Sequence, residues 1–145
     1  MNDTNPITIN TVINAPIEKV WECWTKPEHI TKWAFASDDW EAPHAENDVR
    51  TGGAFKTRMQ EKGTTNGFDF NGIYTNVEEF RTIEYDMEKG PQEEKNRHVK
   101  AVFETTPEGV KVTQTFDPEN ENPIELQREG WQSILDNFKK YTEQR

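Results

Sequence analysis

Hydrophobic and polar residues alternate along most of this chain, with apolar side chains at every second position of several short segments. A two-residue period is typical of a strand with one buried face. The alternation predicts strands over residues 7–13, 54–61, 67–77, 81–88, 97–106 and 110–116. In residues 67–77 apolar side chains fall on both parities, which indicates a bulge or a strand partly buried on both faces. Short turns between successive strands favour an antiparallel meander.

The last twenty residues of the pattern have the three- and four-residue spacing of an amphipathic helix, predicted over Asn122–Tyr141. Asn122 suits the N-cap, Pro123 the first helical position and Glu125 the capping box. The apolar stripe contains Ile124, Gln127, Trp131, Ile134, Leu135, Phe138 and Tyr141. A helix of this length spans roughly 30 Å and needs a large apolar partner. The predicted sheet is the obvious partner.

Two shorter helices are predicted between the first strand and the meander. Pro16 opens the first, whose apolar face carries Val20, Trp21 and Trp24, and Lys26-Pro27 stops it. The second runs from Pro27 to Trp33. The pair resembles a helix-turn-helix in shape, but its second helix has too few cations to bind DNA in that way.

Residues 34–48 lack a regular period and predict a loop of about fifteen residues, a length typical of functional or disordered loops. Phe35 and Trp40 favour an ordered loop. Gly52-Gly53 predicts a tight turn or a bulge, and the charged segment 89–96 predicts an exposed hairpin tip.

The length predicts one globular domain spanning residues 1–145, and the predicted strands and helices together make it an α+β domain. Hydrophobic residues make up only 32%, but five Trp, eight Phe and three Tyr supply large apolar surfaces for a core. A net charge of -10 and the lack of a basic stripe exclude nucleic-acid binding through bulk electrostatics.

The cysteine content and the N-terminal sequence predict a cytoplasmic protein. Cys23 is the sole cysteine, so no intrachain disulfide can form, which fits a reducing compartment. The N-terminus has neither the basic nor the apolar region of a secretion signal, and no apolar run reaches membrane-spanning length. We therefore expect no membrane insertion.

Several short motifs follow one another in order between about Ile7 and Tyr141. They are Asn14-Ala15-Pro16, Val20-Trp21, Thr25-Lys26-Pro27-Glu28, Ile30, Trp33, Arg50-Thr51-Gly52-Gly53-Ala54-Phe55, Gly72-Ile73-Tyr74, Ile83-Glu84-Tyr85, Gly130-Trp131, Ile134-Leu135 and Phe138. In these motifs and their order the chain resembles the START-like (SRPBCC) superfamily, and within it the homologues of the heat-shock chaperone ATPase activator's C-terminal domain. The resemblance implies a helix-grip fold, in which a curved antiparallel sheet of six to seven strands wraps a long C-terminal helix. It also implies a cavity between sheet and helix of the kind that related proteins use for lipids, polyketides and other apolar molecules.

Candidate ligand-binding residues are large side chains predicted to face this cavity. They are Trp33, Phe35, Trp40, Phe55, Met59, Phe70, Tyr74, Tyr85, Phe103, Trp131, Leu135 and Phe138. For any one of them taken singly, ordinary core is the favoured interpretation. The set as a whole is assigned to a cavity because of the resemblance. Gly130, inside the long helix, has two readings: close approach of the sheet, or space left above a pocket.

Ionisable residues provide no complete catalytic or metal-binding motif. His29, His44 and His98 lie on separate segments without ligand spacing, so we predict no metal and no cofactor. His44, with Asp38, Asp39 and Glu46 near it, is the remaining candidate for acid–base chemistry. A further set of cations could meet an acidic ligand group at the cavity mouth or simply face solvent: Arg58, Arg81, Arg97 and Lys100.

Three functions are compatible with these patterns. The first is binding of an apolar or amphipathic small molecule between the sheet and the C-terminal helix. The second is an enzyme of cyclase or hydrolase type with acid–base groups from residues 34–48. The third is an interaction module that modulates a chaperone ATPase, which would use an exposed patch; a chaperone or homodimer contact belongs to this alternative.

Overall fold

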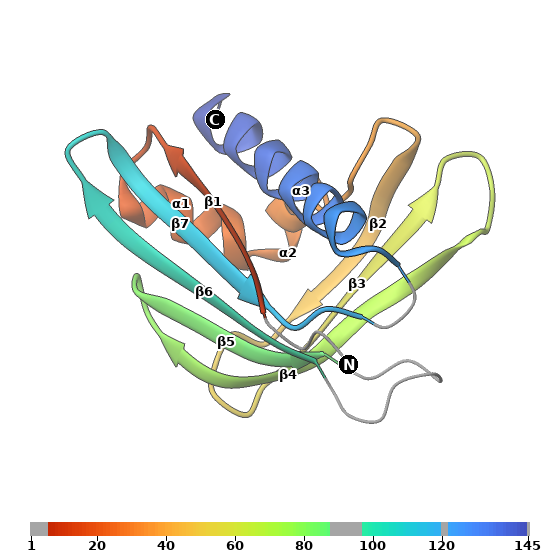
Figure 1. The fold of residues 1–145 in the computed structure, drawn as a ribbon, viewed down its shortest axis with the longest axis horizontal. Helices are drawn as coiled ribbons and strands as arrows, with labels where there is room; N and C mark the ends of the chain where they lie inside the picture. The colour runs from red at the N-terminus through yellow and green to blue at the C-terminus, as the bar shows by residue number, and fades with distance from the viewer. Residues whose placement is uncertain (1–5, 88–96, 120–121, 145) are drawn as a thin grey trace.

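A curled antiparallel sheet grips one long helix (Figure 1). The computed structural model describes residues 6–87, 97–119 and 122–144. The seven strands are β1 (Ile7–Ile13), β2 (Trp40–Asn47), β3 (Ala54–Glu61), β4 (Gly67–Glu78), β5 (Thr82–Met87), β6 (Arg97–Thr106) and β7 (Gly109–Phe116). The helices are α1 (Ile17–Thr25), α2 (Pro27–Ile30) and α3 (Ile124–Gln144). The predicted helix-grip fold is confirmed.

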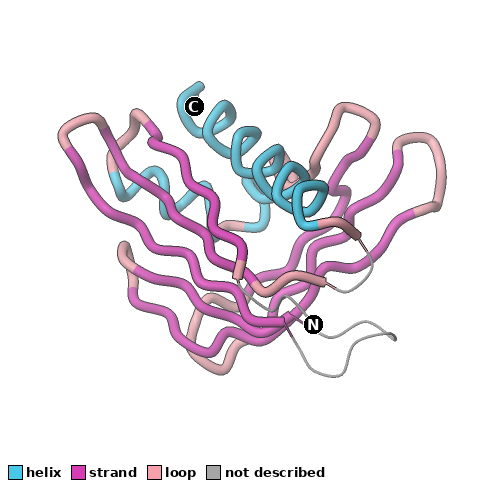
Figure 2. The backbone as a smooth tube through the Cα atoms, in the orientation of Figure 1, coloured by secondary structure: helices cyan, strands magenta, loops and turns pink. Residues whose placement is uncertain are grey.

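The strand order is β1-β7-β6-β5-β4-β3-β2, so consecutive strands from β2 to β7 are neighbours and β1 joins the end of the meander. All pairs are antiparallel, and β1 pairs with β7 from Ile7 opposite Phe116 to Ile13 opposite Val110. The sheet curls around α3 as a half-barrel (Figure 2). Its two free edges, β1 and β2, therefore lie on opposite sides of the helix.

The irregular stretch 34–48 was predicted as a loop, and this prediction is wrong, because residues 40–47 form β2. The strand pairs with β3, but its register shifts between Glu41 and His44. Pro43 lies at this irregularity and cannot donate a ladder hydrogen bond, which confines it to edge strands and bulges. The bulge breaks the two-residue period, so the strand has no alternation that the sequence could reveal.

The two short helices occupy the hollow of the sheet beside α3 (Figure 1). α1 follows Pro16 as predicted and buries Val20, Trp21 and Cys23. α2 ends at Ile30, three residues before the predicted end, and continues as a turn through Trp33. The Trp33 indole donates a 2.9 Å hydrogen bond to the carbonyl of Cys23, which ties this turn to α1.

Helix α3 begins at Ile124 and runs to Gln144, three residues beyond the predicted end. Its start differs from the predicted capping box. The Asn122 amide donates to the Glu119 carboxylate, and Glu125 accepts a hydrogen bond from Arg128 at 3.2 Å. The Asn122 and Glu125 side chains therefore bond to Glu119 and Arg128.

Helix α3 also covers the free edge of β1. Side chains on one face of the helix donate to carbonyl groups at every second residue of the strand: Arg128 to Thr8 and Gln132 to Asn10, both at 3.3 Å, and Lys139 to Val12 at 2.7 Å. From Arg128 to Gln132 the helix advances about 6 Å, close to the advance of two strand residues, whereas Lys139 reaches Val12 from seven residues further along the helix. These bonds let the helix satisfy an edge that could otherwise pair with another chain.

The core lies where α3 and α1 meet the concave face of the sheet. Phe116, Phe138 and Leu135 are almost fully buried. The Trp131 ring stacks on Phe116 with centroids 3.9 Å apart. The predicted bulge in β4 is confirmed between Tyr74 and Asn76, whereas the predicted tip at 89–96 lies outside the described residues.

Candidate functional site

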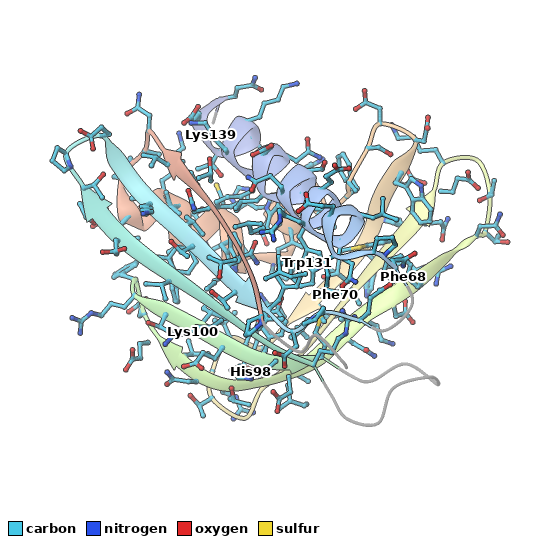
Figure 3. All side chains as sticks on the ribbon, viewed as in Figure 1. Phe68, Phe70, His98, Lys100, Trp131 and Lys139 are labelled. Atoms are coloured by element: carbon cyan, nitrogen blue, oxygen red, sulfur yellow. The ribbon has the colours of Figure 1, made fainter. Side chains whose placement is uncertain are left out.

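A cavity of about 260 Å³ lies between the concave face of the sheet and α3. Strands β2 to β7 contribute to its lining, the turn after α2 closes one end, and α3 contributes Trp131, Ile134 and Leu135. Figure 3 shows Trp131 and Phe70 close together beneath the N-terminal half of α3, with Phe68 further out. Phe68 lines the cavity and is also 51% exposed, which places the mouth beside β4.

Eight of the twelve candidate residues line this cavity. They are Trp33, Phe55, Met59, Phe70, Tyr74, Tyr85, Trp131 and Leu135. Their rings meet mostly edge to face, as in the pairs Phe55–Tyr85 at 4.8 Å and Phe70–Tyr85 at 6.1 Å between centroids. Such contacts hold the walls in defined positions. Their role as ligand contacts stays a prediction.

The other four candidates are not part of the described lining. Phe103 packs between Trp21 and Trp24, and Phe138 packs against Trp24 and Trp33. Trp40 lies 6.2 Å from the ring of Phe68, and the carbonyl of Phe35 accepts a hydrogen bond from Asn137. Phe103 and Phe138 are core residues because α1 fills the hollow at that end of the sheet.

Gly130 is not explained by close approach of the sheet. A Cβ atom at this position would meet nothing within 4 Å among the described residues, once the backbone of α3 itself is set aside. Of the two readings of this glycine, the close-approach reading is wrong. Gly130 is not part of the described lining either.

One polar network in the cavity wall is internally satisfied. The Tyr74 hydroxyl donates to Asn47 Oδ1, and Asn47 Nδ2 donates to the carbonyl of Thr25 at 2.6 Å. Burial raises the pKa of Tyr74 well above its ordinary value, which keeps the hydroxyl protonated as the donor. The network joins β4, β2 and the end of α1, so it fixes one wall of the cavity.

Three further polar side chains line the cavity without a hydrogen-bond partner among the described residues: Thr57, Tyr85 and Gln114. They are 6%, 7% and 6% exposed. Burial also raises the pKa of the Tyr85 phenol, so it remains a donor. Buried polar groups in native proteins nearly always have a partner, protein or otherwise. These side chains are therefore the groups most ready to bind an occupant.

Charged side chains of both signs reach the cavity lining, Arg97 from β6 and Glu119 from the segment before α3. Among the four cations considered for the mouth, Arg97 shares the inward parity of Val99, whereas Arg81 and Lys100 are exposed. Arg58 pairs with Asp69 at 3.7 Å. The signal for Arg97 was present in the sequence, since Arg97, Val99 and Ala101 alternate with outward residues.

Gln114 and Glu119 were missed by sequence reasoning. Gln114 occupies the apolar parity of β7, between Val112 and Phe116, so its position in the pattern already pointed inward. Because its side chain is polar, Gln114 did not count as an inward residue in the hydrophobic pattern. Glu119 lies outside any regular element, and no periodicity could have placed it.

Two of the three histidines have partners away from the cavity. His29 Nδ1 lies 2.6 Å from the Tyr141 hydroxyl, and the residue is buried between α2 and α3. His44 Nε2 lies 2.8 Å from Glu46, and both side chains are exposed on β2. The expectation that residues 34–48 direct acid–base groups into the pocket is therefore wrong for His44 and Glu46.

His98 lies on the outer face of the sheet (Figure 3). Its Nδ1 is 2.7 Å from Asp86 and its Nε2 is 3.0 Å from Glu84. Burial alone would lower the pKa of His98, but the hydrogen bonds to Asp86 and Glu84 raise it overall. The same contact with His98 holds the pKa of Glu84 below its ordinary value. This cluster is an electrostatic tie between β5 and β6.

No three metal-ligating side chains come together within the described ranges. None of the helices described is long and apolar enough to cross a membrane. Within the described part of the chain, the cavity lining contains hydrogen-bond donors, acceptors and aromatic rings, but none of the three histidines.

Comparisons with known proteins give the family. The model described as "Activator of Hsp90 ATPase homolog 1-like protein" matches residues 14–143. The AHSA1-like protein from Aeromonas hydrophila is 38% identical, with a TM-score of 0.87 over 96% of this chain and 92% of that one. Chr148 from Cytophaga hutchinsonii is 44% identical, with a TM-score of 0.79 over 97% and 93%.

Protein CV1439 from Chromobacterium violaceum shares the fold at 21% identity, with a TM-score of 0.85 over 96% of this chain and 97% of that one. No curated protein sequence matches the chain. The family model covers nearly the whole sequence, and two solved relatives exceed 30% identity over almost their full length. The chain therefore belongs to the Activator of Hsp90 ATPase homolog 1-like family, within the START-like (SRPBCC) superfamily.

Proposed function

We propose that the chain binds an apolar or amphipathic small molecule in the cavity between the sheet and α3. The observation that carries the proposal is the size of that cavity, about 260 Å³. Native interiors contain few voids larger than a water molecule. Ligand pockets span roughly 300–1,000 Å³, so this volume is near their lower end and far above ordinary packing defects.

The energetics of the cavity support an occupant. At about 24 cal/mol per Å³, an empty cavity of this volume would cost up to roughly 6 kcal/mol relative to a filled one. Access at the mouth beside Phe68 lets water reduce that cost. A ligand that contacts the aromatic walls recovers more of it than water does, because ring surfaces gain from apolar burial.

The alternatives have less support in the described residues. His44 and Glu46 bond to each other at 2.8 Å on the surface, which disfavours the enzyme with acid–base groups from residues 34–48. A chaperone-binding patch would need several apolar side chains on one continuous exposed surface. The large apolar side chains that are exposed among the described residues do not share one face of an element: they are Phe68, Ile73, Phe80 and Leu126.

The test is mass spectrometry of molecules extracted from the purified protein, followed by thermal shifts with the extracted compounds. Ala34 is buried and lines the cavity, so Ala34→Leu should occupy part of the space and abolish the ligand-induced shift. Ala54→Leu, on the exposed start of β3, is the matched control and should leave the shift intact. No extracted compound, together with no shift from an apolar and amphipathic panel, would refute the proposal.

A further inference from the structure

We propose that the occupant is an uncharged single-ring molecule with one carbonyl group, bound by the hydroxyl groups of Tyr85 and Thr57. This inference rests on the proposed function, since it names the ligand class for the same cavity. Three observations carry it: the volume of the cavity, the charges of both signs in its lining, and two buried hydroxyl groups beside one aromatic ring.

The volume limits the ligand to a small molecule. A cavity of about 150 Å³ binds benzene, so by proportion about 260 Å³ accommodates roughly ten non-hydrogen atoms. One ring with two short substituents fits this limit. A lipid chain of membrane length does not fit without leaving much of the chain in water, which loses the burial that would drive its binding.

The charged residues in the lining disfavour a charged ligand. Arg97 on β6 and Glu119 in the segment before α3 both line the cavity. A carboxylate in this small volume is repelled by Glu119, and an ammonium group is repelled by Arg97. Arg97 already takes part in an interaction within the protein, so its charge is not left for a ligand anion to compensate. Because an ion that leaves water without a partner is costly to bury, an uncharged ligand is favoured.

Thr57 and Tyr85 present hydroxyl groups to the open volume. Both side chains line the cavity, and neither hydroxyl has a hydrogen-bond partner among the described residues. Neither is one of the described polar atoms that protein encloses completely without a partner, so both hydroxyls reach the cavity itself. Burial raises the pKa of the Tyr85 phenol, which stays protonated and can donate to a ligand oxygen.

The two side chains also border the same ring. Thr57 on β3 pairs with Phe70 on β4, and the Cβ atoms of such cross-strand neighbours are about 5 Å apart. The Tyr85 ring lies 6.1 Å from the Phe70 ring and 4.8 Å from the Phe55 ring, measured between centroids. Phe55 precedes Thr57 by two residues on the same face of β3. A ligand carbonyl beside Phe70 can accept from Tyr85 through one lone pair and from Thr57 through the other.

The aromatic walls around these hydroxyls favour a ring. Phe55, Phe70 and Tyr85 contact one another through edge-to-face or tilted geometries. Trp131 of α3 lies 6.2 Å from Phe70 on the helix side of the cavity (Figure 3). A flat ring can join such an arrangement and gain more than an aliphatic segment of the same area. A ring also loses less conformational freedom on binding than an alkyl chain does.

NMR titration of the full chain with five probes that have equal numbers of non-hydrogen atoms tests this inference. The probes are 4-methylbenzamide, the anion 4-methylbenzoate, the cation 4-methylbenzamidine, the acyclic octanamide, and 4-isopropyltoluene, which has no polar group. We expect 4-methylbenzamide to bind at least roughly tenfold more tightly than either ion, since an ion buried without a partner costs more than one lost hydrogen bond. Octanamide should bind roughly threefold or more weakly than 4-methylbenzamide, because its flexible chain loses more freedom.

Three nearly isosteric variants assign the polar contacts. Tyr85→Phe and Thr57→Val should each weaken 4-methylbenzamide by roughly three- to tenfold, the value of one hydrogen bond, without weakening 4-isopropyltoluene. Both replace a buried hydroxyl that has no partner among the described residues, so the fold should tolerate them. Glu119→Gln keeps an acceptor for the Asn122 amide but removes the charge, so it should tighten 4-methylbenzoate and leave 4-methylbenzamide unchanged. Thr113→Val, on the outward parity of β7, is the control and should change none of the affinities.

The outcomes separate this inference from the proposed function. Binding of either ion or of octanamide as tightly as 4-methylbenzamide would overturn the ligand class and leave a small-molecule binding protein. Unchanged affinity for 4-methylbenzamide in Tyr85→Phe or Thr57→Val would overturn the assigned hydrogen bonds. Binding of none of the probes, while the extracted material does bind, would overturn the ligand class alone. Failure of both the probes and the extracted material would overturn both proposals.

Discussion

Replacement of Gly130 by alanine should stabilise the protein. Gly130 lies inside α3, and a Cβ atom there would meet nothing within 4 Å apart from the helix's own backbone. Glycine costs about 0.5–1 kcal/mol relative to alanine in a helix interior, because it loses more backbone entropy on folding. Because the space at this position is open, the alanine methyl group meets no steric clash that would offset the gain in folding free energy.

The expected size of the effect follows from chain length. In a chain of 145 residues, 1 kcal/mol corresponds to a shift of roughly 2–4 °C in the melting temperature. Gly130→Ala should therefore raise the melting temperature by about 1–4 °C. Circular dichroism measures it through the helical signal, to which α3 contributes most because it is the longest helix. Urea unfolding should show a higher midpoint with an unchanged slope.

Gly72→Ala is the matched control, because its surroundings differ. A Cβ atom at Gly72 would lie 2.3 Å from the carbonyl oxygen of Asp86 and 3.0 Å from the Phe55 ring. Relief of such contacts costs about 1–3 kcal/mol, so this variant should melt at a lower temperature. An unchanged or lowered melting temperature for Gly130→Ala would refute the reasoning, since it would mean that the helix does not accept a side chain there.

Three further predictions concern other parts of the molecule. Phe138→Ala should destabilise by about 3–5 kcal/mol in urea unfolding, because the fully buried ring packs against two tryptophans at 4.8 Å; a loss below 1 kcal/mol would contradict its core role. An NMR titration should place the pKa of His98 above its ordinary 6.5, and Asp86→Asn should lower that pKa. The stability that protonated His98 contributes is complete below about pH 6.5 and is lost as the pH rises through the raised pKa. A gain of stability over the same pH rise would refute the pairing. Cys23 is 2% exposed, so a thiol reagent should label it at the rate of structural opening, and rapid labelling of the native protein would count against its burial.

The local pattern of the sequence was enough to predict most elements, whereas the family came from a resemblance carried by short motifs and their order. A two-residue period assigns alternate side chains to opposite faces of a strand, which is a property of the backbone alone. This is why β1, β3, β6 and β7 were predicted to within one residue. The apolar stripe of α3 is local in the same sense. The inward parity of Arg97 and Gln114 was also present in the sequence, although their polar character hid it.

The tertiary structure decided which of the inward residues line the cavity and which fill the core. Phe103 and Phe70 both face the concave side of the sheet, yet Phe103 packs on Trp21 and Trp24 while Phe70 lines the cavity. The difference depends on α1, which fills one end of the hollow, and on α3, which is held at the β1 edge by hydrogen bonds to Thr8, Asn10 and Val12. The bonds between α3 and β1 join residues 120 to 127 positions apart, and the contacts of Phe103 with α1 join residues about eighty positions apart. A periodic pattern records which face a side chain occupies, but not how far the opposite layer stands from it.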